Sequence, residues 1–282
     1  MPIPERPEGR RQWQTDREWA RLNARIATVD TSPAQRTFTW RPIAAIAACI
    51  IVAATALFVA RHRIGSTPSP QIVTTTAGQR IVVRLGDSST ITLAPATTAR
   101  ITRSDSRRVV ELDGMADFHV THDSAHPFIV RTRGTQTTDI GTEFTVRAYA
   151  SDSSVRVAVT SGVVSLAEAS NPGAALTLNA GDVGIAAPGR PPVREATDAR
   201  AIASWVDGGL SFRNEPLTAV ALELNRWFDV DIRIATPALA ERRVSAVYHD
   251  PTLSGVIDAL SATLGIRAVR NGRVVTLYPA DR

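Results

Sequence analysis

The chain has 282 residues, of which 44% are hydrophobic, and it carries a formal net charge of +5. This length is enough for two modest domains and a tail, and so much apolar content excludes a chain that is disordered throughout. All 32 basic residues are Arg, but they are scattered, few aromatic residues lie among them and no DNA-binding motif is present, so the charge does not indicate nucleic-acid binding.

Residues 1–41 form a polar tail with one predicted helix. Asp16 can cap a helix that runs from Arg17 to Val29, and Trp19, Leu22 and Ile26 would share one face of it. So short a helix cannot bury that face by itself. We therefore expect the face to lie in a partner's groove or on a membrane surface. The alternative is a frayed helix beside the membrane that has no partner.

The segment Pro42–Ala60 predicts a single transmembrane helix. It carries no charge over about 19 residues, which at 1.5 Å per residue can cross a bilayer core of roughly 30 Å. Arg41 precedes it, and Arg61, His62 and Arg63 follow it, as is typical of the headgroup region. A buried core helix is one alternative. A cleavable signal peptide is another, but 41 residues precede the segment and its apolar part is too long.

Charge indicates the orientation of this predicted span only weakly. Three arginines lie within about 20 residues on each side of it, whereas the whole tail has eight Arg against five acidic residues, which favours a cytoplasmic N-terminus. The single cysteine, Cys49, lies within the span. No intrachain disulfide and no zinc site built from thiolates can therefore form.

After a linker at 61–71, residues 72–195 predict a series of short strands. Apolar residues alternate or nearly alternate in the segments Arg80–Leu85, Thr90–Leu93, Val109–Leu112, Phe118–Val120, Phe128–Thr132, Glu143–Tyr149, Val155–Thr160 and Val163–Leu166. Turn signals separate them, among them Gly86–Asp87, Asp113–Gly114, Ser161–Gly162, Asn171–Gly173 and Ala180–Asp182. This regular spacing predicts an all-β sandwich or an open barrel.

Residues 200–282 predict a small α+β module, because the apolar period becomes helical. The two helical stripes are Leu217, Val220, Ala221, Leu224 and Phe228, and Leu253, Val256, Ile257, Leu260 and Leu264. We expect Asn214 to cap the first helix, with Pro216 in its first turn, and Gly265 to end the second. The stripes superpose with an offset of 36 residues. Asn271–Gly272 then predicts a hairpin.

Motifs of catalytic or cofactor sites are missing from the sequence. It contains no Walker loop, no dinucleotide-binding fingerprint, no HExxH and no GxSxG. His119, His122 and His126 are close in sequence, but a strand followed by a turn need not bring them together, so they are expected to be surface residues. Neither a metal nor a cofactor is predicted. The chain is therefore expected to be a binding or signalling module and not a metabolic enzyme.

One dipeptide has a chemistry of its own. In Asp139–Phe144, the Thr142 hydroxyl follows the Gly141 carbonyl directly. If the turn is strained, the Thr142 oxygen can attack that carbonyl and shift the peptide to an ester that water cleaves. Composition alone favours an ordinary turn, because Gly–Thr is a common turn pair.

Several motifs in fixed order make the chain similar to a known family. They are Gly78–Arg80, Arg108–Val120, Pro127–Val130, Gly141–Tyr149 and Trp205–Leu217. On these motifs the chain, from about residue 73 to 228, resembles the FecR family of transmembrane anti-sigma regulators. The α+β module that follows resembles the secretin and TonB N-terminal signalling domain.

This resemblance implies a function and a location. Such regulators lie in the inner membrane as single-pass proteins with the N-terminus in the cytoplasm, where they bind a sigma factor of the extracytoplasmic-function class. Their periplasmic part receives a signal from a TonB-dependent outer-membrane transporter, often one for iron chelates. Trp19, Leu22 and Ile26 are then candidates for sigma-factor contact.

The resemblance also implies roles for residues of the periplasmic part. Leu217, Val220 and Leu224 are candidates for contact with the receptor's signalling domain. Some members cleave themselves at a Gly–Thr bond, which here would be Gly141–Thr142. A different class of function remains as the alternative, a structural envelope adaptor that is anchored in the inner membrane and has no sigma-factor partner.

Overall fold

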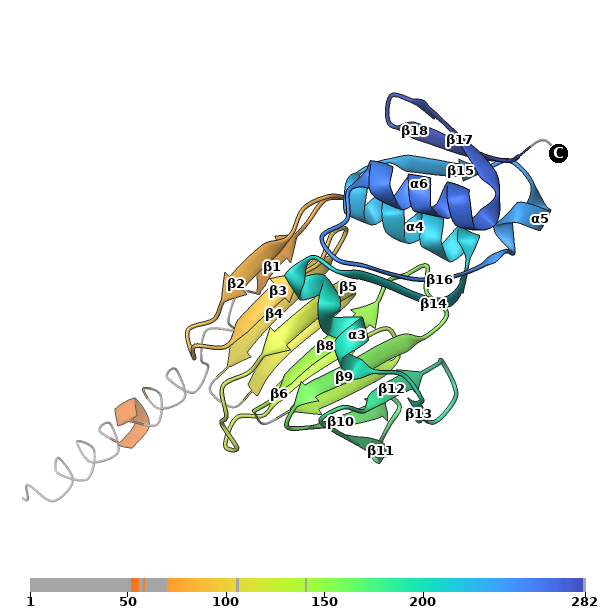
Figure 1. The fold of residues 1–282 in the computed structure, drawn as a ribbon. Coiled ribbons are helices and arrows are strands. Elements are labelled where there is room, and N and C mark those ends of the chain that lie inside the picture. The colour runs from red at the N-terminus through yellow and green to blue at the C-terminus, as the bar shows by residue number, and fades with distance from the viewer. Residues whose placement is uncertain (1–51, 56–57, 59–69, 105–106, 140, 281–282) are drawn as a thin grey trace, which may run out of the picture. The chain divides into compact units, whose positions relative to one another are not determined.

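The computed structural model describes residues 52–55, 58, 70–104, 107–139 and 141–280. The chain divides into two compact units, Met1–Gly65 and Ser66–Arg282, and the fold below is that of the second unit (Figure 1). In the first unit, residues 52–55 and 58 are helical. None of the described helices has both the length and the apolar character needed to cross a membrane. Most of the predicted span Pro42–Ala60, and all of the predicted tail helix, lies outside the described residues.

The larger part of the second unit is a 13-stranded sheet that folds into two halves sharing one long strand, β5 (Arg107–His119). Besides β5, the first half contains β1 (Gln71–Thr74), β4 (Thr98–Ser104), β6 (Phe128–Thr132), β7 (Thr135–Asp139), β10 (Val163–Glu168) and β11 (Asn171–Asn179). The second half contains β2 (Ile81–Arg84), β3 (Thr90–Leu93), β8 (Glu143–Ala148), β9 (Val155–Ser161), β12 (Val183–Ala186) and β13 (Val193–Glu195). Neighbouring strands are antiparallel, except that β5 and β6 are parallel.

Strand β5 crosses between the halves at Gly114, where the sequence predicts a turn. The prediction of two separate strands, with Asp113–Gly114 between them, is therefore wrong. Gly114 has φ +125°, which residues with a side chain rarely adopt. A Cβ on Gly114 would lie 2.7 Å from the Thr97 Cα. The glycine thus bends a continuous strand where it passes close to its neighbour.

One apolar core fills the space between the two halves. At its centre the Phe118 ring stacks on Phe144 with centroids 5.0 Å apart and meets the edge of Phe128 at 5.8 Å. All three side chains are fully buried. The predicted mainly β architecture is confirmed, and the folded sheet is a nearly closed, barrel-like structure.

Two strands of this region show where apolar alternation fails as a signal. Asn171–Gly173 is predicted as a turn but forms the start of β11, opposite Glu168. Strand β7 has the sequence Thr-Gln-Thr-Thr-Asp, in which Thr137 and Asp139 face inward and are buried. Polar side chains at buried positions hide this strand from a search for apolar residues.

A second core belongs to the predicted α+β part, which the short helices α3 (Ala199–Ala203) and η1 (Ser204–Asp207) connect to the sheet. Its elements are β14 (Leu210–Pro216), α4 (Leu217–Phe228), β15 (Asp231–Ile234), α5 (Pro237–Ala240), β16 (Arg243–Tyr248), α6 (Leu253–Leu264), β17 (Ile266–Asn271) and β18 (Val274–Pro279) (Figure 1). Strand β14 pairs with β16, and β18 lies between β15 and β17. The predicted α+β character of this C-terminal module is confirmed.

The 36-residue repeat is visible in its helices. Helices α4 and α6 have equal lengths, and both end in a left-handed residue, Asp229 at φ +52° and Gly265 at φ +56°. The prediction that Asn214 caps α4 is wrong, because Asn214 sits at φ +51° in a bulge of β14. Pro216 is the N-cap residue instead. The N–H of Leu217, in the first turn of α4, has no acceptor within the helix and donates to the Arg242 carbonyl at 2.8 Å.

Candidate functional site

The candidate site is the junction at which the C-terminal module meets the outer face of the second half-sheet. Helix α3 lies across β8 and β9 (Figure 1). The following turn of η1 places the Trp205 ring in a small buried cluster with Ala94, Met115 and Tyr149. Met115 belongs to β5 and Tyr149 follows β8, so the cluster joins both strands to the connecting segment.

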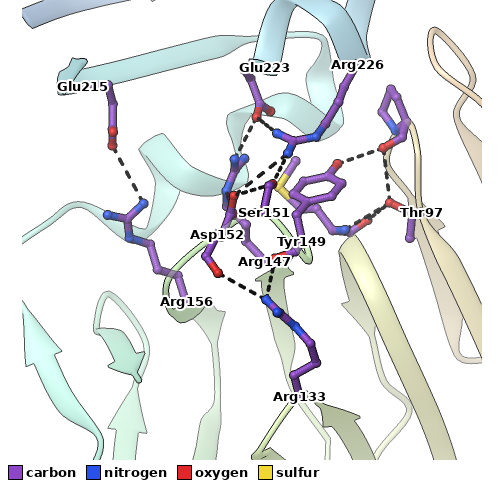
Figure 2. Close-up of polar contacts among 12 residues, drawn as sticks. Thr97, Arg133, Arg147, Tyr149, Ser151, Asp152, Arg156, Glu215, Glu223 and Arg226 are labelled. Carbon is purple, nitrogen blue, oxygen red and sulfur yellow. Dashed lines mark hydrogen bonds and ion pairs between the residues drawn. The ribbon is translucent and has the colours of Figure 1, made fainter. Parts of the chain in front are cut away.

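A buried ion-pair network crosses the junction (Figure 2). The Arg147 guanidinium, at the end of β8, donates through Nη2 to Glu223 Oε2 on α4 at 2.8 Å and through Nε to Asp152 Oδ2 at 2.8 Å. Arg226, one turn further along α4, donates to the same Glu223 oxygen at 3.0 Å. The other oxygen, Oε1, accepts from the Trp227 indole N–H at 2.8 Å. Both carboxylate oxygens of Glu223 are therefore bonded.

This network keeps Glu223 ionised although it is only 7% exposed. Burial by itself raises the pKa of Glu223, but the attraction of Arg147, together with hydrogen bonds from Arg147 and Trp227, outweighs it and holds the pKa at about 2. Burial likewise opposes the charge of Arg147, and its attraction to Glu223 outweighs this and raises the pKa of the guanidinium. Burial raises the pKa of Tyr149 to about 12, so its hydroxyl stays protonated.

An aromatic ring lies beneath these charges. The Arg226 guanidinium carbon is 3.9 Å from the centroid of the Tyr149 ring, and that of Arg147 is 5.1 Å away. The Tyr149 hydroxyl donates to the Pro95 carbonyl at 2.8 Å, and Arg133 donates to the Tyr149 carbonyl at 2.8 Å (Figure 2). The tyrosine is thus fixed from both ends.

Residues of several separate sequence motifs meet at this junction. The Gly78 N–H donates to the Arg226 carbonyl at 2.7 Å. Arg80 donates to the Trp205 carbonyl at 3.0 Å, and its guanidinium carbon is 5.9 Å from the Trp227 ring. The rings of Trp205 and Trp227 have centroids 6.1 Å apart. The Gly-Gln-Arg motif, the end of the Gly-Thr-Glu-Phe motif and the tryptophan motif therefore share one contact region.

A cavity of about 360 Å³ opens beside the network. Arg147, Asp152 and Arg156 line it from the β region, and Glu215 and Glu223 line it from the C-terminal module. Arg156 forms ion pairs with Glu195 at 3.2 Å and with Glu215 at 3.8 Å. The charged groups of this wall thus pair across the junction as well.

The Gly141–Thr142 turn lies away from this network, between β7 and β8. Gly141 has φ +148°, and a Cβ there would be 2.6 Å from the His122 Cα. Thr142 is 7% exposed, and its buried Oγ1 has no hydrogen-bond partner in the part of the chain that the structure describes. The Gly141 N–H donates to Asp139 Oδ1 at 3.0 Å, while Oδ2 of the same carboxylate is buried and has no partner among the described residues. A Cβ on Gly162 would overlap the Thr142 methyl group, so this glycine makes room for the threonine.

The structure places the other predicted site residues as follows. Leu217, Val220 and Leu224 are fully buried in the core of the C-terminal module, so none of these three side chains is exposed at its surface. The exposed apolar residue of the same helix is Leu222, at 46% exposure. Trp19, Leu22 and Ile26 lie outside the described residues.

The histidines of the β5–β6 connection show no grouping of metal-ligand type. His126 Nδ1 lies 2.8 Å from Asp123 Oδ2. This hydrogen bond lowers the pKa of Asp123, and it outweighs the opposite effect of desolvation. Across the described parts of the chain, no three His, Cys, Asp or Glu side chains are grouped as a metal would require.

Sequence patterns missed the central residue of the junction. Glu223 follows Val220 by three residues and precedes Trp227 by four, so it shares a face with them. An acidic residue on a largely apolar helix face needs a buried cation as its partner. The position of Glu223 on such a face could therefore have predicted a buried ion pair. Its partner Arg147 lies in a different part of the fold, 76 residues earlier in the chain.

Comparison with known proteins agrees with this division of the chain. The family model described as FecR protein matches residues 71–165, and the one described as FecR, C-terminal matches residues 209–277. The chain belongs to the FecR family. The first match contains β1 to β9, and the second contains Glu223, so the junction joins the two FecR regions.

Solved structures give the same result. Two crystal structures of a candidate anti-sigma factor from Parabacteroides distasonis ATCC 8503 are similar to this FecR chain, each with a TM-score of 0.68 and 25% sequence identity. They cover 75% and 76% of this chain and 100% of their own. No curated protein is found to match. The family and these neighbours support a role as a sigma-factor regulator.

Proposed function

We propose that this FecR protein is a single-pass regulator of the inner membrane that carries a periplasmic signal to a cytoplasmic sigma factor. The observation that carries the proposal is the ordered pair of FecR matches, whose motif residues meet at one junction. The similarity to two structures of a candidate anti-sigma factor supports it. The apolar, uncharged segment Pro42–Ala60 supports the membrane placement.

In this proposal each part has a task. Residues 1–41 bind a sigma factor of the extracytoplasmic-function class, and Trp19, Leu22 and Ile26 form the contact. The C-terminal module contacts the signalling domain of a TonB-dependent outer-membrane transporter, for which the exposed Leu222 of α4 is available. Because Glu223 and Arg226 tie this helix to Arg147 and Tyr149, a displacement of α4 is transmitted to the β region.

The sigma-factor contact is tested by capture with the full chain in detergent. The bait is compared with a Trp19→Ala, Leu22→Ala, Ile26→Ala variant and with an Arg17→Ala, Arg21→Ala control on the opposite face of the predicted helix. We expect the first variant to lose at least about 90% of the captured sigma factor and the control to keep it, because three apolar anchors give most of such an interface. Capture of no sigma factor by the unaltered chain would favour the envelope adaptor.

The membrane topology is tested by fusing reporters to the C-terminus. Alkaline phosphatase folds into an active enzyme only outside the cytoplasm, because it needs disulfides. We expect an active phosphatase fusion. A fusion that is inactive, while a fluorescent protein at the same position folds in the cytoplasm, would overturn the periplasmic placement.

A second candidate function, self-cleavage at Gly141–Thr142, is favoured by the unpartnered Thr142 hydroxyl beside a left-handed glycine. The Thr142 oxygen attacks the Gly141 carbonyl carbon, the C–N bond breaks, and the hydroxyl proton passes to the leaving nitrogen. Water then hydrolyses the ester. The products are a Gly141 carboxylate and a chain that begins at Thr142.

Intact mass of the purified full chain decides this question. Thr142→Ala is expected to abolish cleavage, and Thr142→Ser to keep it, because only the latter retains a hydroxyl. Thr137→Ala is the matched control, since the Thr137 hydroxyl is also buried and unpartnered but follows Gln136. A single uncleaved mass for the unaltered chain in every condition would speak against this activity.

A further inference from the structure

A second cavity, of about 210 Å³, lies at the end of the barrel-like sheet where the chain enters it. Its walls come from β1, the turn after β2, the end of β4, the start of β5 and Phe128 of β6. Among the described residues that line it are three arginines, Arg84, Arg103 and Arg108, and one acidic residue, Asp87. The described lining therefore carries an excess of two positive charges.

Arg108 forms the floor and is held rigidly. Its side chain is 6% exposed and lies over the Phe128 ring, with 5.5 Å between the guanidinium carbon and the centroid. It donates to the His126 carbonyl at 2.9 Å, to the Thr121 carbonyl at 3.1 Å and to Asp87 at 2.8 Å. Its Nη2 atom is buried and has no hydrogen-bond partner among the described residues. One donor of a well-anchored guanidinium thus lacks an acceptor.

Arg84 and Arg103 lie at the exposed rim. Within the described residues, neither forms an ion pair with a carboxylate. The Arg103 guanidinium lies directly on the turn at Gly86, since a Cβ there would be 2.7 Å from Nη1. Two arginines that have no carboxylate partner among the described residues therefore lie at the mouth of a cavity whose floor is a third arginine.

We propose that this cavity is a binding site for a phosphate group. Guanidinium groups match tetrahedral oxyanions because they offer paired N–H donors in a plane. A phosphate oxygen would also provide an acceptor for the Nη2 atom of Arg108. The carboxylate of Asp87 accepts hydrogen bonds from Arg108 and from the Ser89 N–H. Burial by itself raises the pKa of Asp87, but these bonds outweigh it and lower the pKa, so Asp87 is ionised and its charge is paired with that of Arg108.

Two sources can supply this chemistry, free phosphate or the phosphodiester of a lipid headgroup. The lipid source rests on the proposed membrane span. Gln71 lines the cavity, and the ten residues from 61 to 70 can extend over at most about 35 Å. A headgroup therefore lies within reach of the site if the span ends near Ala60, whereas free phosphate needs no membrane.

The site is tested by calorimetric titration of the full chain in a neutral detergent at constant ionic strength. One arm uses inorganic phosphate and the other uses glycerophosphoglycerol, the soluble headgroup of phosphatidylglycerol. The test variant is Arg84→Gln, Arg103→Gln. It keeps Arg108, whose hydrogen bonds to the His126 and Thr121 carbonyls hold the loop after β5. The control is Arg131→Gln, Arg190→Gln, which removes the same charge from exposed residues outside the cavity.

We expect saturable phosphate binding that weakens at least about tenfold in the test variant and less than about twofold in the control. Headgroup binding as tight as that of phosphate assigns the site to lipid, and binding of phosphate alone assigns it to free phosphate. Absence of saturable binding in both arms, or equal weakening in the control, overturns the proposal. Because these titrations need no bilayer, their outcome is independent of the topology test above.

Discussion

Two buried carboxylates of this FecR protein, Glu223 and Asp117, have different surroundings. Glu223, on α4, is 7% exposed and is bonded to Arg147 and Arg226. Asp117 is 8% exposed and lies two residues from Met115 on the same outer face of β5. Its bonded partner is a neutral hydroxyl, that of Thr145 at 2.7 Å.

The pKa values of the two groups move in opposite directions. Attraction by the arginines outweighs burial at Glu223 and holds its pKa at about 2. At Asp117, burial raises the pKa to about 6, and the nearby charges of Glu143 and Asp207 add to this, while Thr145 and His119 oppose it. Burial disfavours the charged form of both acids. The bonded partner therefore decides whether the ionised carboxylate stabilises or destabilises the folded chain.

The largest expected effect is at Glu223. In Glu223→Ala, Arg147 and Arg226 lose the buried carboxylate that both contact, although both still pair with Asp152. We therefore expect the free energy of unfolding of the full chain to fall by about 3–5 kcal/mol. Urea denaturation in detergent, followed by tryptophan fluorescence, measures it, since Trp205 and Trp227 lie at the junction. A loss below about 1 kcal/mol would show that the network does not hold the junction.

Acid titration gives the next effect. Because the folded pKa of Glu223 is lowered from 4.5 to about 2, its contribution is fully present above pH 4.5 and is lost as the pH falls toward 2. That difference corresponds to about 3 kcal/mol. We expect the free energy of unfolding of the unaltered chain to fall over this range, and that of Glu223→Gln to fall by about 3 kcal/mol less. Parallel curves would contradict the assigned pKa.

Asp117 should behave in the opposite way. Its folded pKa lies above the unfolded value of 3.8, so the cost of its charge is absent below pH 3.8 and complete above about pH 6. We expect Asp117→Asn to stabilise the chain by about 2–3 kcal/mol at pH 8 and to be neutral at pH 3.5. The same denaturation curves at both pH values measure this. A variant that is destabilised at pH 8 would mean that the charged form is needed there.

These contrasts explain which parts of the fold the sequence could predict. Alternation predicts β8, and helical spacing predicts α4, because each pattern reports which side of an element is buried. It does not report what that side is buried against. The pairing of Arg147 with Glu223, and the passage of β5 through Gly114 close to Thr97, are relations between distant segments. They therefore could not be predicted from local pattern.

The smallest expected effect comes from an ion pair of the same β region that lies in solvent. Arg100 and Glu111 are 3.5 Å apart on neighbouring strands β4 and β5, and their side chains are 48% and 56% exposed. Water screens this pair, and neither charge has been removed from solvent, so we expect Glu111→Ala to change the free energy of unfolding by less than about 0.5 kcal/mol. This variant also removes a carboxylate from an Arg–carboxylate pair and is thus the control for Glu223→Ala. A loss as large as that of Glu223→Ala would mean that burial is not what makes the junction pair matter.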